Sequence, residues 1–172
     1  MSSPLLQVRV QAQAIDVAAE DAGLQERSGH GAGARVSFVG LVRADPDEGV
    51  TELSLEHYPG MTERVLGDIL SSAAERWPLL AAGVVHRVGA MRLGENIVWV
   101  GVTAAHRQAA FMAAEFIMDQ LKTTAPFWKK QTAAAGARWL AARASDEQAS
   151  RRWALAEPAI PPAAVCRDDK DR

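Results

Sequence analysis

Three lysines close together in the second half of this 172-residue chain are the residues best suited to chemistry. The sequence holds fifteen arginines and only four lysines, and three of the four are Lys122, Lys129 and Lys130. Burial or a neighbouring cation can lower the pKa of an ammonium group until it serves as a base or nucleophile, whereas guanidinium keeps its charge. The cluster therefore suggests a functional amine. Alternatively, Lys122 stabilises a helix C-terminus and the other two lysines face solvent.

The pair His106 and Arg107 is a second candidate, because it falls between an apolar strand pattern and a long helical pattern. Free backbone N–H groups at a helix start bind anions, and an adjacent imidazole and guanidinium would strengthen such a site. The alternative is that His106 only caps the helix while Arg107 is solvated. Arg43 ends another strand pattern and is a third candidate, although strand-end arginines are most often solvated.

Several other chemistries find no support in the residues. The single cysteine, Cys166, lies in a C-terminal segment rich in proline and charge, so no disulfide, redox pair or thiolate zinc site is expected. No His, Asp and Glu set has the spacing of metal ligands, and no glycine-rich phosphate loop occurs. We therefore expect neither a metal nor a cofactor. His57 and His86 fall within strand patterns and are predicted to be structural.

Composition narrows the class of protein further. The formal charge is −2 and the isoelectric point is near 6.1, which argues against a domain that holds nucleic acid by bulk electrostatics. No uncharged apolar run exceeds about nine residues, well short of the roughly 20 that a membrane helix needs. The N-terminus lacks the pattern of a secretory signal, so a cytoplasmic protein is expected.

Strand and helix patterns interleave along the chain. Strands are predicted at 5–13, 34–43, 50–57, 83–88 and 96–105, and helices at 16–29, 61–77, 106–123 and 146–154.

Further expectations concern the arrangement of these elements. Apolar residues on both faces of 34–43 predict a central strand, and the short turn before 50–57 predicts a hairpin between the two strands. The chain is thus predicted to be α+β, with a mixed or antiparallel sheet and packed helices, in one domain at 1–154. Residues 155–172 are predicted to form a disordered tail. The long helix is expected to bury a stripe formed by Phe111, Ala114, Met118 and Leu121.

Three segments, in this order and spacing, also resemble a known family: FVGLVR, then LEHYPGMTE, then AHRQAAFMAAEFIMDQLKTTAPFWKK. They are similar to the catalytic large subunit of molybdopterin synthase, and the likeness runs from about Val8 to Trp153, where RASDEQASRRW fits the family's closing helix. The resemblance implies an α/β-hammerhead-like fold and a homodimer with one small subunit at each end, which makes a heterotetramer.

The resemblance also implies a reaction in molybdenum cofactor biosynthesis. The family converts cyclic pyranopterin monophosphate to molybdopterin by installing two dithiolene sulfurs. Each sulfur arrives as a thiocarboxylate on the C-terminal Gly-Gly of a small ubiquitin-like partner. The sequence does not end in Gly-Gly, so this chain is not expected to be the sulfur donor.

Site residues follow from the resemblance position by position. The family's catalytic lysines fall on Lys122 and Lys129. Its substrate-binding positions fall on Leu41, Val42, Arg43, His106, Arg107, Lys129, Lys130 and Gln131. Gln131 stands where a glutamate is common, and Leu41 stands where some members have lysine. On this basis Arg43, His106 and Arg107 are expected to bind the substrate phosphate.

Helix length raises a difficulty for a site within one chain. His106 and Lys122 are 16 residues apart, which is about 24 Å along a helix and about twice the length of the substrate. The sequence therefore predicts a site shared between two copies of the chain. Two other functions stay open at this point: a non-catalytic phosphate- or nucleotide-binding module, and a scaffold that binds a ubiquitin-like protein without chemistry. The division of roles between Lys122 and Lys129 and the order of the two sulfur transfers also stay open.

Overall fold

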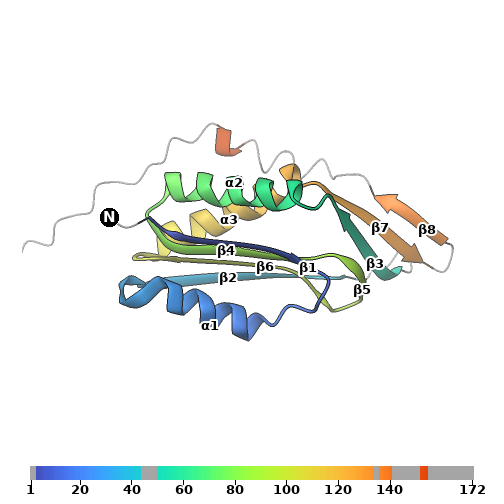
Figure 1. Ribbon diagram of the computed structural model, residues 1–172, viewed down its shortest axis with the longest axis horizontal. Helices are drawn as coiled ribbons and strands as arrows, with labels where there is room; N and C mark the ends of the chain where they lie inside the picture. The colour runs from blue at the N-terminus through green and yellow to red at the C-terminus, as the bar shows by residue number, and fades with distance from the viewer. Residues whose placement is uncertain (1–2, 44–49, 134–135, 141–151, 155–172) are drawn as a thin grey trace, which may run out of the picture.

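The structure is a computed structural model that describes residues 3–43, 50–133, 136–140 and 152–154 (Figure 1). Its elements confirm the predicted α+β class and follow one another along the chain as β1 (Leu5–Gln11), α1 (Val17–Ser28), a 3-10 turn (Gly29–Gly31), β2 (Ala34–Leu41), β3 (Val50–His57), α2 (Met61–Arg76), β4 (Leu79–Arg87), β5 (Gly89–Arg92), β6 (Asn96–Ala104), α3 (Arg107–Thr124), β7 (Phe127–Ala133), β8 (Gly136–Leu140) and a 3-10 turn (Arg152–Ala154).

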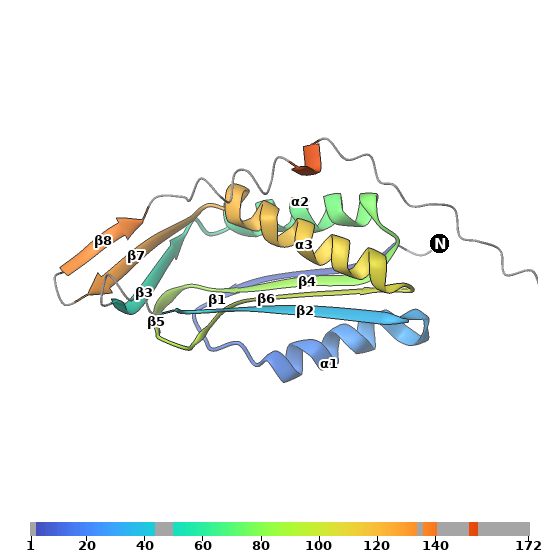
Figure 2. The ribbon, with the colours of Figure 1, turned by 180° about the vertical axis from the view of Figure 1, so that it is seen from behind.

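The larger core surrounds a four-stranded sheet with the strand order β1-β4-β6-β2. β1 is parallel to β4, and the other pairs are antiparallel. Helices α2 and α3 cover one face of this sheet and α1 covers the other, as both lengthwise views show (Figures 1 and 2). Because both faces are covered, β4 and β6 are buried along most of their length and read as continuous apolar runs.

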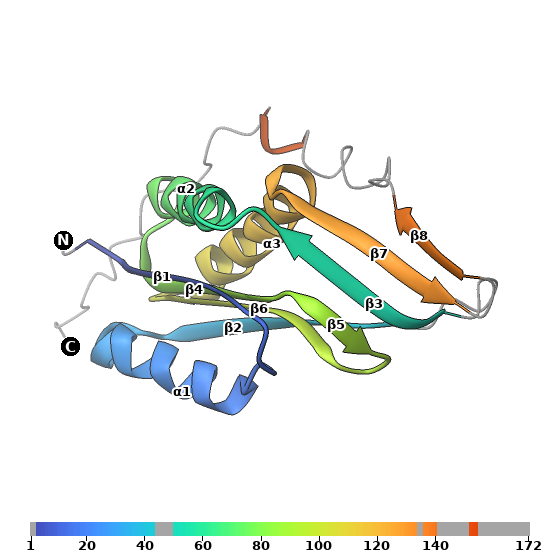
Figure 3. The same ribbon diagram turned by 45° about the vertical axis from the view of Figure 1, so that its right-hand side comes forward.

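A second sheet, with the order β5-β3-β7-β8, projects from one end of the first (Figure 3). A single residue separates β4 from β5, and Gly89 then turns the chain at a φ of 82°. The second sheet has its own small core of Val42, Leu53, Leu55 and Met91. The junction between the two sheets is therefore short and closely connected.

Two predictions about strand 34–43 are wrong. β2 pairs only with β6, at the edge of the first sheet, and Phe38 on it is 40% exposed. β3 belongs to the second sheet, so the two strands form no hairpin. Ala34 and Val36 pack against the larger core on one face of β2, and Val39 packs against the cluster under α1 on the other, which gives an edge strand the pattern of a central one.

The predicted stripe of α3 is only partly right. Ala114 and Leu121 are buried, but Phe111 is 62% exposed. The helix instead packs through small residues such as Ala110 and Ala113, which bring its axis close to the sheet. Of the predicted helix 146–154 the structure describes only Arg152–Ala154, a 3-10 turn, and the predicted tail 155–172 lies outside the described residues.

Candidate active site

Lys122 and Lys129 lie on either side of the junction between α3 and β7. Lys122 is exposed in the last turn of α3, and the helix ends where Ala125 becomes extended before Pro126. β7 begins at Phe127, so only two residues separate the helix from the strand, and Figure 2 shows α3 leading directly into β7. The local stop signal at Pro126 thus places both amines at one end of the molecule.

The strand register fixes the direction of Lys129. It lies opposite Leu55 of β3, while Phe127 lies opposite His57. Opposed residues in an antiparallel pair share a sheet face, as do residues two apart, so Lys129 extends from the face that holds Leu55, His57 and Phe127. Lys130 lies opposite Ser54 and belongs to the other face. The two neighbouring lysines therefore extend from opposite faces of the sheet.

Leu41, Val42 and Arg43 converge on the same end of the molecule. Val42 is 4% exposed, and its side chain packs in the core of the second sheet. Its N–H donates to the carbonyl of Glu95 at 2.9 Å, and its carbonyl accepts from the N–H of Gly94 at 2.8 Å. Leu41 and Arg43 on either side are exposed. Val42 therefore anchors this segment to the sheet that carries Lys129. Gln131 lies two positions beyond Lys129 in β7, opposite Leu53.

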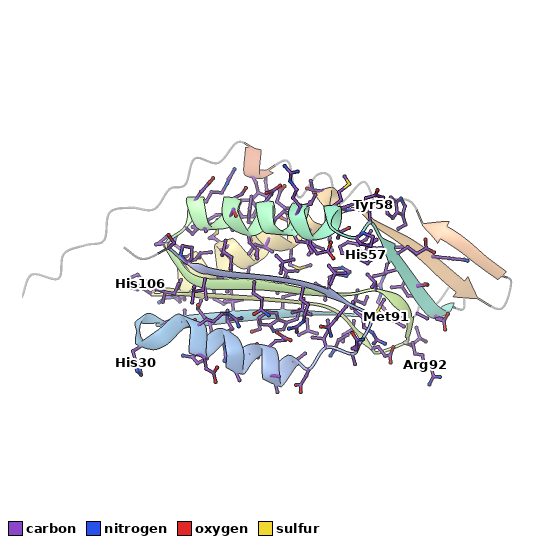
Figure 4. All side chains as sticks on the ribbon, viewed as in Figure 1. His30, His57, Tyr58, Met91, Arg92 and His106 are labelled. Atoms are coloured by element: carbon purple, nitrogen blue, oxygen red, sulfur yellow. The ribbon has the colours of Figure 1, made fainter. Side chains whose placement is uncertain are left out.

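His106 and Arg107 lie at the other end. His106 occupies the N-cap position of α3 with no side-chain capping bond, and both residues are exposed. Figure 4 shows His106 at the opposite end of the molecule from His57 and Met91. Arg43 is also remote from His106, because β6 runs between their two ends and spans about 26 Å at 3.3 Å per residue. One chain alone therefore does not assemble the expected phosphate cluster of Arg43, His106 and Arg107.

Segment 55–63 secures the junction that carries the lysines. The hydroxyl of Thr62 accepts from the N–H of Tyr58 at 3.3 Å and donates to the carbonyl of Pro126 at 3.5 Å. The Glu63 carboxylate accepts from the N–H of Gly60 at 2.7 Å and so caps the start of α2. The start of α2 is thus tied to the turn between Lys122 and Lys129.

The C-terminal segment braces α3 from its outer side. The indole N–H of Trp153 donates to Asp119 at 2.8 Å, and the Arg152 guanidinium donates to the same carboxylate at 2.6 Å. Trp153 is 5% exposed and meets Trp77 and Phe116 edge to face, with ring centroids 5.7 and 5.5 Å apart. This contact holds the turn of α3 that precedes Lys122.

His86, predicted to be structural, is 4% exposed at the end of β4. Its Nδ1–H donates to the carbonyl of Arg87 at 2.9 Å. Burial lowers the pKa of His86 to about 4, against the opposing effect of that hydrogen bond and with smaller contributions from the charges of Lys129 and His57. The ring is therefore uncharged at neutral pH. Its only sequence signal is one histidine within an apolar strand.

No three His, Cys, Asp or Glu side chains gather as a metal site within the part of the chain that the structure describes. The site residues offer primary amines, which bind anions and can move protons, and guanidinium groups, which bind anions and keep their charge. In the same described ranges, no helix is long and apolar enough to cross a membrane.

Known proteins similar to this chain share one function. A family model described as MoaE protein matches residues 10–124. The chain is 51% identical over 148 residues to the molybdopterin synthase catalytic subunit of Pseudomonas aeruginosa, which covers 85% of this chain and 97% of that protein. A solved structure of the molybdopterin biosynthesis MoaE protein from Burkholderia ambifaria matches with a TM-score of 0.75 and 44% identity, over 88% of this chain and all of that one. Molybdopterin synthase from Staphylococcus aureus matches with a TM-score of 0.71 and 28% identity, over 77% and 96% of the two chains.

Proposed function

Because this chain belongs to the MoaE protein family, the family of molybdopterin synthase catalytic subunits, we propose that it transfers sulfur to cyclic pyranopterin monophosphate to make molybdopterin. It is an enzyme subunit of molybdenum cofactor biosynthesis. The sulfur comes from a thiocarboxylate at the C-terminal Gly-Gly of a small ubiquitin-like partner. The relatives' description as catalytic subunits supports a second subunit in the complex.

The placement of Lys122 and Lys129 around one junction is the observation that carries the proposal. Lys122 acts as the base or transient nucleophile toward the thiocarboxylate carbonyl. Lys129 and Lys130 hold the partner's tail or the oxyanion that develops on it. Their positions on opposite faces of β7 support separate roles for these two lysines.

The substrate phosphate is bound across two copies of the chain. In an antiparallel two-fold dimer, His106 and Arg107 of one copy come near Lys122 and Lys129 of the other. The separation of these groups within one chain supports this arrangement, because the substrate is only about half as long as the helix between them. One small subunit at each end completes a heterotetramer. Location in the cytoplasm stays a prediction from the sequence.

Reconstitution tests the reaction. Purified protein, thiocarboxylated partner and cyclic pyranopterin monophosphate are expected to yield a dithiolene pterin, detected by mass spectrometry, without ATP or a divalent cation. Lys122→Ala is expected to abolish most turnover, and Lys122→Arg to fail nearly as badly, because guanidinium does not serve as a base. Lys170→Ala is the matched control for loss of one lysine. Near-normal turnover by Lys122→Arg, or an absolute need for ATP, contradicts this mechanism.

The two alternative functions, a non-catalytic phosphate- or nucleotide-binding module and a scaffold for a ubiquitin-like protein, predict different outcomes. A phosphate-binding module keeps its ligand when the lysines are replaced, and a scaffold binds the partner equally well as carboxylate or thiocarboxylate.

Mixing two inactive variants tests the shared site. Lys122→Ala and Arg107→Ala subunits that exchange randomly form mixed dimers with one intact site, so activity is expected to return to about a quarter of wild type. Verified mixed dimers that stay inactive would place the whole site within one chain.

A further inference from the structure

His86 and Phe127 make a stacked contact that joins the two sheets beside Lys129. The ring centroids are 3.8 Å apart and the ring planes differ by 17°. His86 belongs to β4 of the first sheet, and Phe127 is the first residue of β7 in the second. Lys129 follows two residues later on the same face of β7. The stack therefore ties the start of β7 to β4 of the first sheet.

A second connection reaches Lys129 through the backbone. Gly89, three residues after His86, pairs with Leu55 of β3, and Leu55 pairs with Lys129 of β7. The β4–β5 segment is thus connected to β7 in two ways: directly through the ring stack, and through the paired residue Leu55 of β3. Because β7 is restrained at both places, the backbone from which the Lys129 side chain extends has little freedom to move.

The chemistry of the His86 ring suits it to this position. Its Nδ1–H is used by the carbonyl of Arg87, which sets the plane of the ring. The groups that face it are Lys129 from β7 and His57 from β3, and His57 in turn lies 3.7 Å from the carboxylate of Glu63. A charged ring would repel the Lys129 ammonium, and an uncharged one does not.

We propose that His86 is a positioning residue for Lys129: its uncharged ring stacks on Phe127 and so fixes the strand from which the Lys129 amine reaches the reacting groups. The role of Lys129 in catalysis rests on the proposed function. The placement of its amine by His86 does not, and it can be measured without turnover.

Two substitutions separate the ring from the bulk of the side chain. His86→Leu fills the buried position with an apolar side chain that has no ring, whereas His86→Phe keeps a ring that can stack. Val84→Ala is the matched control, because Val84 is a fully buried residue on the same face of β4, two positions earlier. If His86→Leu does not fold, as judged by circular dichroism, His86→Met replaces it as the variant without a ring.

The first readout is the NMR signal of the Lys129 amine after reductive methylation with ¹³C-formaldehyde. The chain has only four lysines, so each signal can be assigned by a single Lys→Arg variant. In His86→Leu the Lys129 signal is expected to move toward its position in the urea-unfolded protein. In His86→Phe and Val84→Ala it is expected to stay at the wild-type position.

The second readout is reconstituted turnover. His86→Leu is expected to lower kcat at least about tenfold with KM for the partner within about twofold, because a displaced catalytic group costs rate more than binding. His86→Phe is expected to stay within about threefold of wild type. A folded His86→Leu protein with the wild-type Lys129 signal and kcat would overturn the proposal. If the wild-type protein makes no dithiolene pterin, the proposed function fails, and the NMR comparison still decides the role of His86.

Discussion

Acid should destabilise this protein through His86, and the size of the effect follows from its burial. The pKa of His86 is about 4 in the folded chain, against about 6.5 for an exposed histidine. Between these two values the unfolded chain binds a proton that the folded chain excludes, so stability falls as the pH falls through this window. From pH 7.5 to pH 5 the expected loss from this one group is about 2 kcal/mol, and below pH 4 it approaches about 3 kcal/mol.

The assay compares urea unfolding of the wild type and His86→Phe at pH 7.5 and at pH 5. Carboxylates and the exposed histidines titrate in both proteins, so their contributions cancel when the two pH-dependent changes are subtracted. His86→Phe keeps the aromatic contact with Phe127 but has no proton to bind. The wild type is expected to lose about 2 kcal/mol more than the variant. Equal losses in the two proteins would mean that His86 titrates like an exposed histidine, and the argument from burial would be refuted.

Further predictions concern packing and the C-terminus. A Cβ on Gly101 would lie 2.3 Å from the indole of the buried Trp99, so Gly101→Ala is expected to cost at least about 1–3 kcal/mol in urea unfolding. Gly67→Ala, where a Cβ on α2 meets nothing within 4 Å, is expected to stabilise by about 0.5–1 kcal/mol, and equal effects of the two substitutions would contradict this account. Deleting 155–172 is expected to leave the melting temperature and activity unchanged, whereas Trp153→Ala is expected to cost about 3–5 kcal/mol because it opens a buried aromatic cluster. A large drop in melting temperature on the deletion would instead show that the tail packs on the body.

Features of the structure that depend on a few neighbouring residues could be predicted from the sequence. Asp16 precedes α1 and its carboxylate accepts from the N–H of Ala19 at 3.0 Å, as an N-cap should. Pro126 ends α3 and so separates Lys122 from Lys129 by a fixed, short turn. The spacing of His106 and Lys122 likewise followed from helix geometry alone. Each of these features depends on neighbours within about one or two turns of chain, and the residue types there carry the information.

Pairings between distant segments were decided by the tertiary structure. β2 joins β6, some sixty residues away, and not β3, which is the next strand along the chain. Apolar residues on both faces of a strand show only that both faces are covered. They do not show which strands lie beside it, because helices can cover both faces of an edge strand as well as of a central one. The sequence around His86 likewise shows only one histidine in an apolar strand and does not indicate its partner. Its stacking on Phe127, 41 residues later, arises because β4 and β7 meet where two sheets join, and that meeting depends on how the whole core is buried.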